Sequence, residues 1–271
     1  MSNQKRRFRF PSVVLALIVL ACAYFTFAKP SCKNCSPTVT QFSTINALVE
    51  GNYDGVATMG CLKKAGDFGI GCVEPLDGEL AVLDGEAYQI RFDGSVHKLT
   101  DEIKTPFAAV LKFKSSREGQ VSNVPDLAEL IKYLDTLIPE SNMLVAVRIT
   151  GVFDHVHTRS VPPQKKPYPR LCDVTKNQPE FEADNQEGDI IAFRLPEYLA
   201  GVNATGWHMH FLSKDKKFGG HLLGISTKNA SVKVCLSREF KMVLPPEGHD
   251  FYKTNLSKDT TNELKTIETA K

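Results

Sequence analysis

The chain has 271 residues, of which 42% are hydrophobic and 24% charged, with 18 glycines and 15 prolines. This composition supplies a sizeable core and excludes a disordered chain, a coiled coil, a collagen and a polytopic membrane protein. The net charge is +2, but residues 1–28 contribute four basic residues and no acidic one. Removing these from the 33 basic residues leaves 29 against 31 acidic ones, a net charge of −2, which gives no general electrostatic reason to bind nucleic acid.

The first 28 residues have the pattern of a targeting segment. Residues 1–10 are basic, and Val13–Leu20 is an unbroken apolar run followed by small residues of the kind that a signal peptidase recognises. The apolar stretch 13–28 has 16 residues, fewer than the roughly 20 that a spanning helix needs. We interpret residues 1–28 as a signal peptide or signal-anchor, with a lipidated Cys22 as a third alternative. Each alternative predicts a secreted or extracytoplasmic protein, and a membrane tether through residues 13–28 stays open.

Residues 29–39 contain proline and serine and are predicted to be a linker. Cys32 and Cys35 in this segment have a spacing found in redox and zinc sites, but no second such pair follows and no βαβ pattern surrounds them. We therefore favour a local disulfide or two unused thiols.

Residues 40–160 are predicted to form a mixed α/β domain. Helical spacing of apolar residues predicts helices at 42–50, 58–65 and 125–138. Alternation with period two, bounded by Asp-Gly turn dipeptides, predicts strands at 79–83, 87–92, 107–113 and 143–149.

Val161–Leu171 has four prolines in eleven positions, which excludes a central strand or a helix and predicts a connector. Further strands are predicted at 189–194, 208–212, 221–226, 231–236 and 241–244, with a terminal helix at 260–270. The predicted fold class is therefore α/β (α+β) with two sheet-based domains. The N-terminal domain has a mixed sheet, and residues 161–271 form a mostly antiparallel β domain.

Three of the seven histidines are close together in the sequence. His208 and His210 are two residues apart on a predicted strand, so both point to the same face. The polar segment Ser213–Gly220 reads as a hairpin loop that brings His221 back beside them. Three imidazoles with one open position are the ligand set of catalytic zinc sites. The alternative that these histidines only pack or face solvent stays open at this point.

Several separated motifs, in unbroken order from about Phe42 to the C terminus, closely resemble α-acetolactate decarboxylases. The motifs are Gly66–Cys72 with Leu76–Leu80, Thr105–Ala108, His155–Pro162 and Gly206–His221. The resemblance implies a zinc-dependent enzyme that converts 2-acetolactate, a 2-hydroxy-3-oxo acid, to acetoin and CO2. It also implies two α/β domains, with the metal in the C-terminal one.

The resemblance also implies roles for individual residues. It matches the zinc ligands to His208, His210 and His221, and it matches an active-site arginine and glutamate to Arg159 and Glu79. The family's second glutamate lies in the tail, where Glu268 fits best and Glu263 is the fallback. We expect the tail to pack over the zinc site and deliver Glu268.

The chemistry agrees with this assignment. Loss of CO2 from a 3-oxo acid leaves an electron pair, and a ketone oxygen on Zn2+ can accept it as an enediolate. Arg159 offers a fixed, charged fork for a carboxylate. Glu79 or Glu268 then supplies the proton, and the sequence does not distinguish them.

Two alternatives from other classes accompany this hypothesis. One is a secreted protein that binds zinc or a small ligand on the same scaffold without turnover. The other is a zinc hydrolase, which is disfavoured because no H-E-x-x-H motif is present. A homodimer also stays open. We leave His155 and His157 out of the ligand set and expect them either to support the site from outside the ligands or to stabilise the fold.

Overall fold

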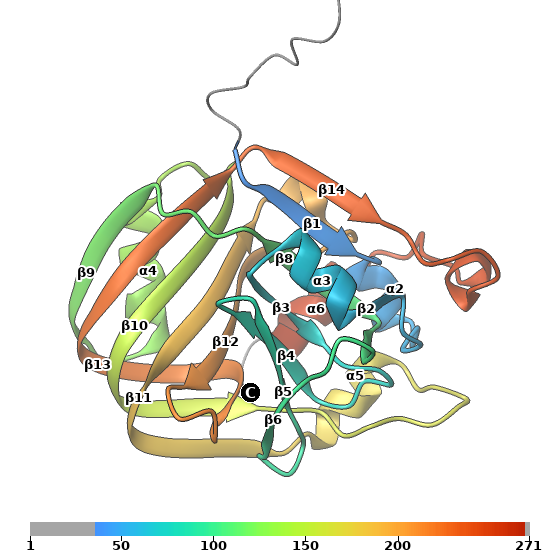
Figure 1. Ribbon diagram of the computed structural model, residues 1–271, viewed down its shortest axis with the longest axis horizontal. Coiled ribbons are helices and arrows are strands. Elements are labelled where there is room, and N and C mark those ends of the chain that lie inside the picture. The colour runs from blue at the N-terminus through green and yellow to red at the C-terminus, as the bar shows by residue number, and fades with distance from the viewer. Residues whose placement is uncertain (1–35, 269–271) are drawn as a thin grey trace, which may run out of the picture. The chain divides into compact units, whose positions relative to one another are not determined.

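Two β-sheets packed against each other form the framework of the protein (Figure 1). The computed structural model describes residues 36–268. The leader, Cys22 and the Cys32/Cys35 pair lie outside the described residues, so the interpretations of them stay predictions.

The first sheet has seven strands in the order β14-β1-β8-β3-β4-β5-β6. Its strands are β1 (Thr38–Phe42), β3 (Phe68–Cys72), β4 (Glu79–Leu83), β5 (Glu86–Ile90), β6 (Val96–Lys98), β8 (Phe107–Leu111) and β14 (Glu239–Val243). β1 and β14 are parallel and the other pairs are antiparallel, so the sheet is mixed. A separate two-stranded sheet joins β2 (Ala57–Thr58) to β7 (Lys104–Thr105).

The second sheet is antiparallel and has five strands in the order β10-β11-β12-β13-β9. Its strands are β9 (Arg117–Val124), β10 (Leu144–Arg159), β11 (Glu180–Leu195), β12 (Gly206–Ser213) and β13 (Gly219–Ser237). β10 pairs with both β11 and β13, so the ladder of four strands closes on itself. Figure 1 shows the resulting strong curvature of these long strands.

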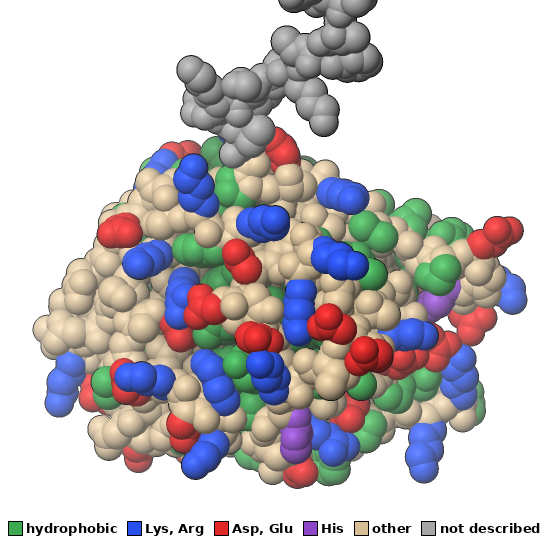
Figure 2. Space-filling model, viewed as in Figure 1, with side chains coloured by type: hydrophobic (Ala, Val, Ile, Leu, Met, Phe, Trp, Pro, Cys, Tyr) green, Lys and Arg blue, Asp and Glu red, His purple; other side chains and the backbone are tan. Residues whose placement is uncertain are grey.

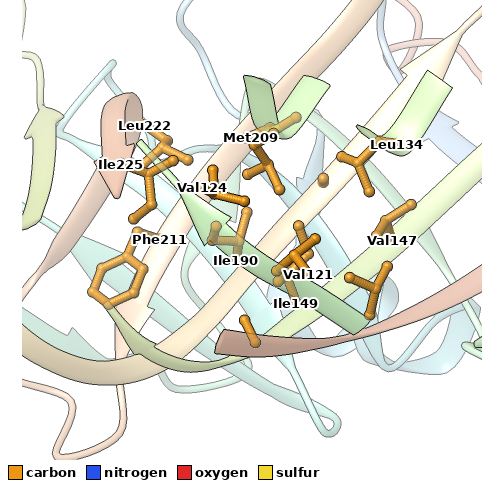
Figure 3. Close-up of a cluster of buried hydrophobic side chains, with 14 of the residues drawn as sticks. Val121, Val124, Leu134, Val147, Ile149, Ile190, Met209, Phe211, Leu222 and Ile225 are labelled. Atoms are coloured by element: carbon orange, nitrogen blue, oxygen red, sulfur yellow. The ribbon is translucent and has the colours of Figure 1, made fainter. Parts of the chain in front are cut away.

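Short helices cover the outer faces and one end of the sheets. They are α2 (Ile45–Val49), α3 (Met59–Ala65), α4 (Leu127–Leu137), α5 (Leu171–Val174), α6 (Thr261–Glu268) and the 3₁₀ turns η1 (Thr175–Asn177), η2 (Glu197–Leu199) and η3 (Asp250–Lys253). α3 packs on one face of the seven-stranded sheet through Met59 and Leu62. α4 packs on the five-stranded sheet, where Leu134 lies among Val147, Ile149 and other core side chains (Figure 3).

A second layer of core lies between the two sheets and positions the candidate site. β4 is buried on both faces, with Leu80 and Val82 on the α3 side and Ala81 and Leu83 facing the five-stranded sheet. Because side chains alternate along a strand, Glu79 points to the same side as Ala81, toward the five-stranded sheet.

The structure confirms the mixed α+β class and the mixed and antiparallel sheets. The expected boundary at residues 160 and 161 does not separate the sheets, because β9 and β10 precede it and β14 follows it. Residues 40–160 and 161–271 thus each contribute strands to both sheets, and the described residues belong to one compact unit.

Three expected elements also differ from the observed ones. The helix expected at 42–50 starts only at Ile45, because Thr38–Phe42 is taken up as a strand between β14 and β8. Thr38 and Val39 therefore belong to β1 and not to the linker. The strands expected at 221–226 and 231–236 are one continuous strand, β13, because it pairs with β10 from His221 to Ser237.

The surface of the described residues carries charges of both signs. On the face shown in Figure 2, lysine and arginine side chains are interspersed with aspartate and glutamate. No helix among residues 36–268 is long and apolar enough to cross a membrane.

Leu134 tests the packing of α4 on the five-stranded sheet. Its side chain is fully buried in the core cluster. We expect Leu134→Ala to lower the free energy of unfolding by about 2–5 kcal/mol, because the lost methyl groups leave a cavity. Lys132→Ala, on the exposed face of the same helix, should cost less than about 1 kcal/mol. Equal denaturant midpoints for the two variants would contradict this packing.

Candidate active site

Strand β12 presents two histidines on the face that looks toward the seven-stranded sheet. Met209 and Phe211 alternate with them and pack into the core cluster under α4. His208 and His210 therefore point the other way, as strand alternation requires. The side chain of His210 is fully buried, and that of His208 is 11% exposed.

A hairpin brings the third histidine beside them, as the sequence predicted. His210 pairs with His221, and Phe211 pairs with Gly220. A register shift in the β10–β13 pairing then changes the alternation of β13, so that both Leu222 and Ile225 pack into the same core cluster. Such a bulge re-aims side chains next to it, and here it leaves His221 facing the site.

The three imidazoles converge closely enough to share one metal ion. The candidate ligand nitrogens of His208, His210 and His221 all lie within 4.8 Å of one another. The Nε2 atoms of His208 and His210 are 3.2 Å apart. Three nitrogens about 2.1 Å from one tetrahedral zinc would be about 3.4 Å apart, so the side chains fit such an ion with small adjustments.

Hydrogen bonding and burial keep these histidines in the form that binds metals. Nδ1 of His210 donates to the carbonyl oxygen of Leu80 at 2.9 Å, which leaves the lone pair of Nε2 facing the site. Burial, helped by the charge of Arg159, lowers the pKa of His208 to about 3. Burial also places the pKa values of His210 and His221 well below the ordinary range.

Two carboxyl groups complete the cluster. Oε2 of Glu79 lies 3.4 Å from Nε2 of His210. Oε2 of Glu268 lies 3.7 Å from Nε2 of both His208 and His221. This buried oxygen has no hydrogen-bond partner among the described residues, so the arrangement fits a cation at this point.

Burial makes both carboxyl groups weak acids. It raises the pKa of Glu79 to about 7, while Arg159 opposes this shift and the nearby Glu268 adds to it. Burial likewise raises the pKa of Glu268 to about 7, again against the effect of Arg159. Repulsion between two carboxylates at one site disfavours ionisation of both, so the pair tends to retain a proton near neutral pH.

Helix α6 carries Glu268 to the histidines. Leu264 and Ile267 are buried in an apolar cluster with residues of α2 and α5. Thr260, just before the helix, donates to the Asn46 side chain. The fallback candidate Glu263 instead pairs with Arg170 on the flank of α6, at 2.9 Å.

Arg159 lies at the end of β10 and is 3% exposed. Its Nη1 donates to Oε1 of Gln178 at 2.7 Å, and its Nη2 donates to the carbonyl oxygen of Ile267 at 2.7 Å. Sequence analysis missed Gln178 and the carbonyl groups of Leu80 and Ile267. A sequence motif records side chains and does not show which backbone carbonyls accept hydrogen bonds. Gln178 follows a short turn and has no recognisable spacing from Arg159.

His155 and His157 lie away from the cluster. His155 pairs with Asp184 and His157 with Glu180, both at 2.9 Å across the β10–β11 ladder. Both acidic partners are exposed, which fits the omission of these histidines from the ligand set.

Two cavities meet at this cluster. An inner one of about 40 Å³ is lined by Glu79, Arg159, His208, His221 and Glu268, together with apolar side chains. A larger one of about 380 Å³ shares His221 and Glu268 with it and is otherwise mostly apolar, with Trp207, Met209 and Leu264 in its walls. The second volume lies in the range of small-molecule sites.

Together, the convergent imidazoles, the weakly acidic carboxyls and the buried guanidinium define a polar centre of the kind found in metal-dependent enzymes. The sequence profile of the alpha-acetolactate decarboxylase family matches residues 39–258. The alpha-acetolactate decarboxylase of Methanosarcina mazei is 40% identical over 235 residues, which cover 87% of this chain and 81% of that protein. That of Methylococcus capsulatus is 42% identical over 210 residues, covering 78% and 81%.

A solved structure agrees with these matches. The crystal structure of alpha-acetolactate decarboxylase from Bacillus subtilis strain 168 aligns with a TM-score of 0.83 and 32% sequence identity, over 86% of this chain and 100% of that one. The chain belongs to the α-acetolactate decarboxylase family and is, as a member, a carboxy-lyase. The profile match stops before α6, so the position of Glu268 rests on the geometry alone.

The metal-binding capacity of the centre gives a prediction. We expect the purified protein to bind about one zinc ion per chain, and His210→Ala to lose this ion, because two imidazoles hold it far more weakly than three. His157→Ala is the matched control, since this histidine lies on the same sheet outside the cluster, and it should keep full occupancy. Metal analysis after dialysis measures both, and equal zinc contents would contradict the ligand set.

Proposed function

We propose that this protein decarboxylates 2-acetolactate to acetoin and CO2 in a zinc-dependent reaction. The observation that carries the proposal is the convergence of His208, His210 and His221 beside a buried arginine and two weakly acidic carboxyl groups. The family membership supplies the substrate, a 2-hydroxy-3-oxo acid. The three histidines would hold the ion, and Glu268 lies beside them.

When bound, zinc would supply Lewis-acid chemistry that stabilises the negative charge developing on the substrate's ketone oxygen as CO2 leaves. The donor set fits this task because three neutral ligands leave the charge of the ion largely uncompensated and leave coordination positions open.

Arg159 binds and orients the carboxylate that is lost. Its guanidinium is permanently charged and lines the inner cavity, and its buried Nε has no partner among the described residues. The inner cavity places this guanidinium beside His208, His221 and both carboxyl groups. The rest of the substrate would extend toward the larger cavity past His221.

Glu79 and Glu268 handle the proton. A carboxyl group with a pKa of about 7 can hold a proton near neutral pH and release it to the enediolate that remains after CO2 leaves. The two carboxyls approach the imidazoles from different elements. Glu79 on β4 lies beside His210, and Glu268 on α6 lies beside His208 and His221. Protonation from one side fixes the handedness of acetoin.

The test is acetoin and CO2 release from racemic 2-acetolactate by the metal-analysed protein. Turnover that requires bound zinc supports the proposal. Zinc binding without turnover would instead favour the non-catalytic binding protein, and ester or amide hydrolysis would favour the hydrolase. We also propose that residues 1–28 direct export, which sequencing of the mature N terminus tests.

Arg159→Lys separates carboxylate orientation from metal binding. Lysine keeps the charge but loses the planar fork and its hydrogen bonds to Gln178 and Ile267. We expect an unchanged zinc content and a fall in kcat/KM of about 10² or more, because the substrate is no longer held in its reactive orientation. Wild-type turnover in this variant would return Arg159 to a structural role.

Glu268→Gln tests the carboxyl that α6 delivers. The amide keeps the shape of the side chain but cannot exchange a proton, so kcat should fall by about 10² or more. Glu263→Gln, one turn earlier on the same helix, is the control. It loses the ion pair with Arg170, away from the histidines, and its activity should stay within about fivefold of wild type.

The pH profile is a second readout of the same carboxyls. A proton donor works only while protonated, so wild-type kcat should decline as the pH rises through about 7. Because Glu268 raises the pKa of Glu79, the residual activity of Glu268→Gln should decline at a lower pH than that of wild type. A profile that is flat from pH 5 to pH 9 in both proteins would exclude these carboxyls as donors.

A further inference from the structure

Arg159 is held in place by two neutral acceptors. Oε1 of Gln178 and the carbonyl oxygen of Ile267 each accept one hydrogen bond of 2.7 Å from its two terminal nitrogens. No carboxylate among residues 36–268 forms an ion pair with this guanidinium, although Glu79 and Glu268 line the same cavity. An arginine that is 3% exposed is usually paired with a carboxylate, so this arrangement is unusual.

The segment that carries Gln178 is itself firmly anchored. Gln178 follows η1, and its backbone N–H caps that turn through the carbonyl of Thr175. The carbonyl of the next residue, Pro179, accepts from the backbone N–H of Ser160 at 3.2 Å. Arg159 pairs with Glu180 across the β10–β11 ladder. The backbone of Gln178 is therefore fixed relative to the backbone of Arg159, and its side chain reaches Nη1 from this anchored position.

The two hydrogen bonds determine which donors remain for a ligand. They occupy one N–H of Nη1 and one N–H of Nη2, and Nε stays buried without a partner. Nε and one hydrogen on each terminal nitrogen are therefore left without a protein acceptor. A carboxylate can accept charge-assisted hydrogen bonds from such donors.

We propose that Gln178 is a positioning residue for the decarboxylation, holding Arg159 through a neutral oxygen so that its full charge and its remaining N–H donors stay available to the substrate carboxylate. This inference rests on the proposed function for the identity of the substrate. The proposal explains why residue 178 carries an amide and not a carboxylate. A carboxylate there would form the same hydrogen bond and would neutralise the charge that the substrate needs.

The experiment compares Gln178→Glu, Gln178→Met and the exposed control Gln120→Glu, each as the full zinc-loaded protein. Thermal unfolding, zinc content, kcat and KM for acetolactate are measured for each. Dissociation constants are measured by calorimetry for a non-reacting hydroxy acid, 2-hydroxy-2-methylpropanoate, and for the neutral product acetoin.

Gln178→Glu should unfold at the wild-type temperature or above it, because the hydrogen bond to Arg159 becomes charge-assisted. Its KM and its dissociation constant for the hydroxy acid should both rise by about tenfold or more, because a second anion neutralises the guanidinium. The dissociation constant for acetoin should stay unchanged. Gln178→Met removes the acceptor but adds no charge, so it should lower kcat more than it raises KM. Gln120→Glu should match wild type.

Wild-type kinetics in Gln178→Glu would overturn the proposal, as would equal weakening of the hydroxy acid and acetoin. A lower unfolding temperature with an unchanged KM in both position-178 variants would show a merely structural residue. If the wild type fails to decarboxylate acetolactate, the proposed function is wrong. In that case the dissociation constants for the hydroxy acid and for acetoin still decide the role of Gln178, because binding measurements need no turnover.

Discussion

The hydrogen bond from His210 to the carbonyl of Leu80 joins the two sheets at the site. The other features of the centre depend on it, because Leu80 is the neighbour of Glu79 on β4. The same short stretch of strand therefore orients an imidazole with its backbone and supplies a carboxyl with its side chain. A slip of one residue in the β3–β4 register would turn Glu79 toward α3 and move the carbonyl away from His210.

Burial is the main cause of the pKa shifts within the centre, and one guanidinium acts on all of the groups involved. Arg159 lowers the pKa values of the histidines and of both carboxyls, so it favours neutral imidazoles and opposes the effect of burial on the acids. Its position depends on β10 and on backbone contacts with α6. The packing of α6 and the protonation of the three histidines are thereby linked, although α6 and the histidines lie far apart in the sequence.

Much of this arrangement was predictable, and the reasons for the exceptions are physical. The spacing of His208 and His210 and the glycine-ended loop before His221 are local signals, so they predicted the cluster and the hairpin. No strand was expected at β9, and the boundary expected at residues 160 and 161 does not separate the two sheets, because pairing between distant strands has no local signature. The tail alignment favoured Glu268 and kept Glu263 as the fallback. In the structure Glu268 lies beside the histidines, on a helix that Leu264 and Ile267 anchor in an apolar cluster.

The parallel pairing of β1 with β14 has a consequence for biosynthesis. Thr38 and its partner Glu239 are separated by 201 positions, so the edge of the seven-stranded sheet forms only after nearly all of the chain has left the ribosome. α6 follows still later and brings the last carboxyl and the carbonyl that holds Arg159. A nascent chain that has formed the β12–β13 hairpin thus already displays its three imidazoles on an unfinished scaffold.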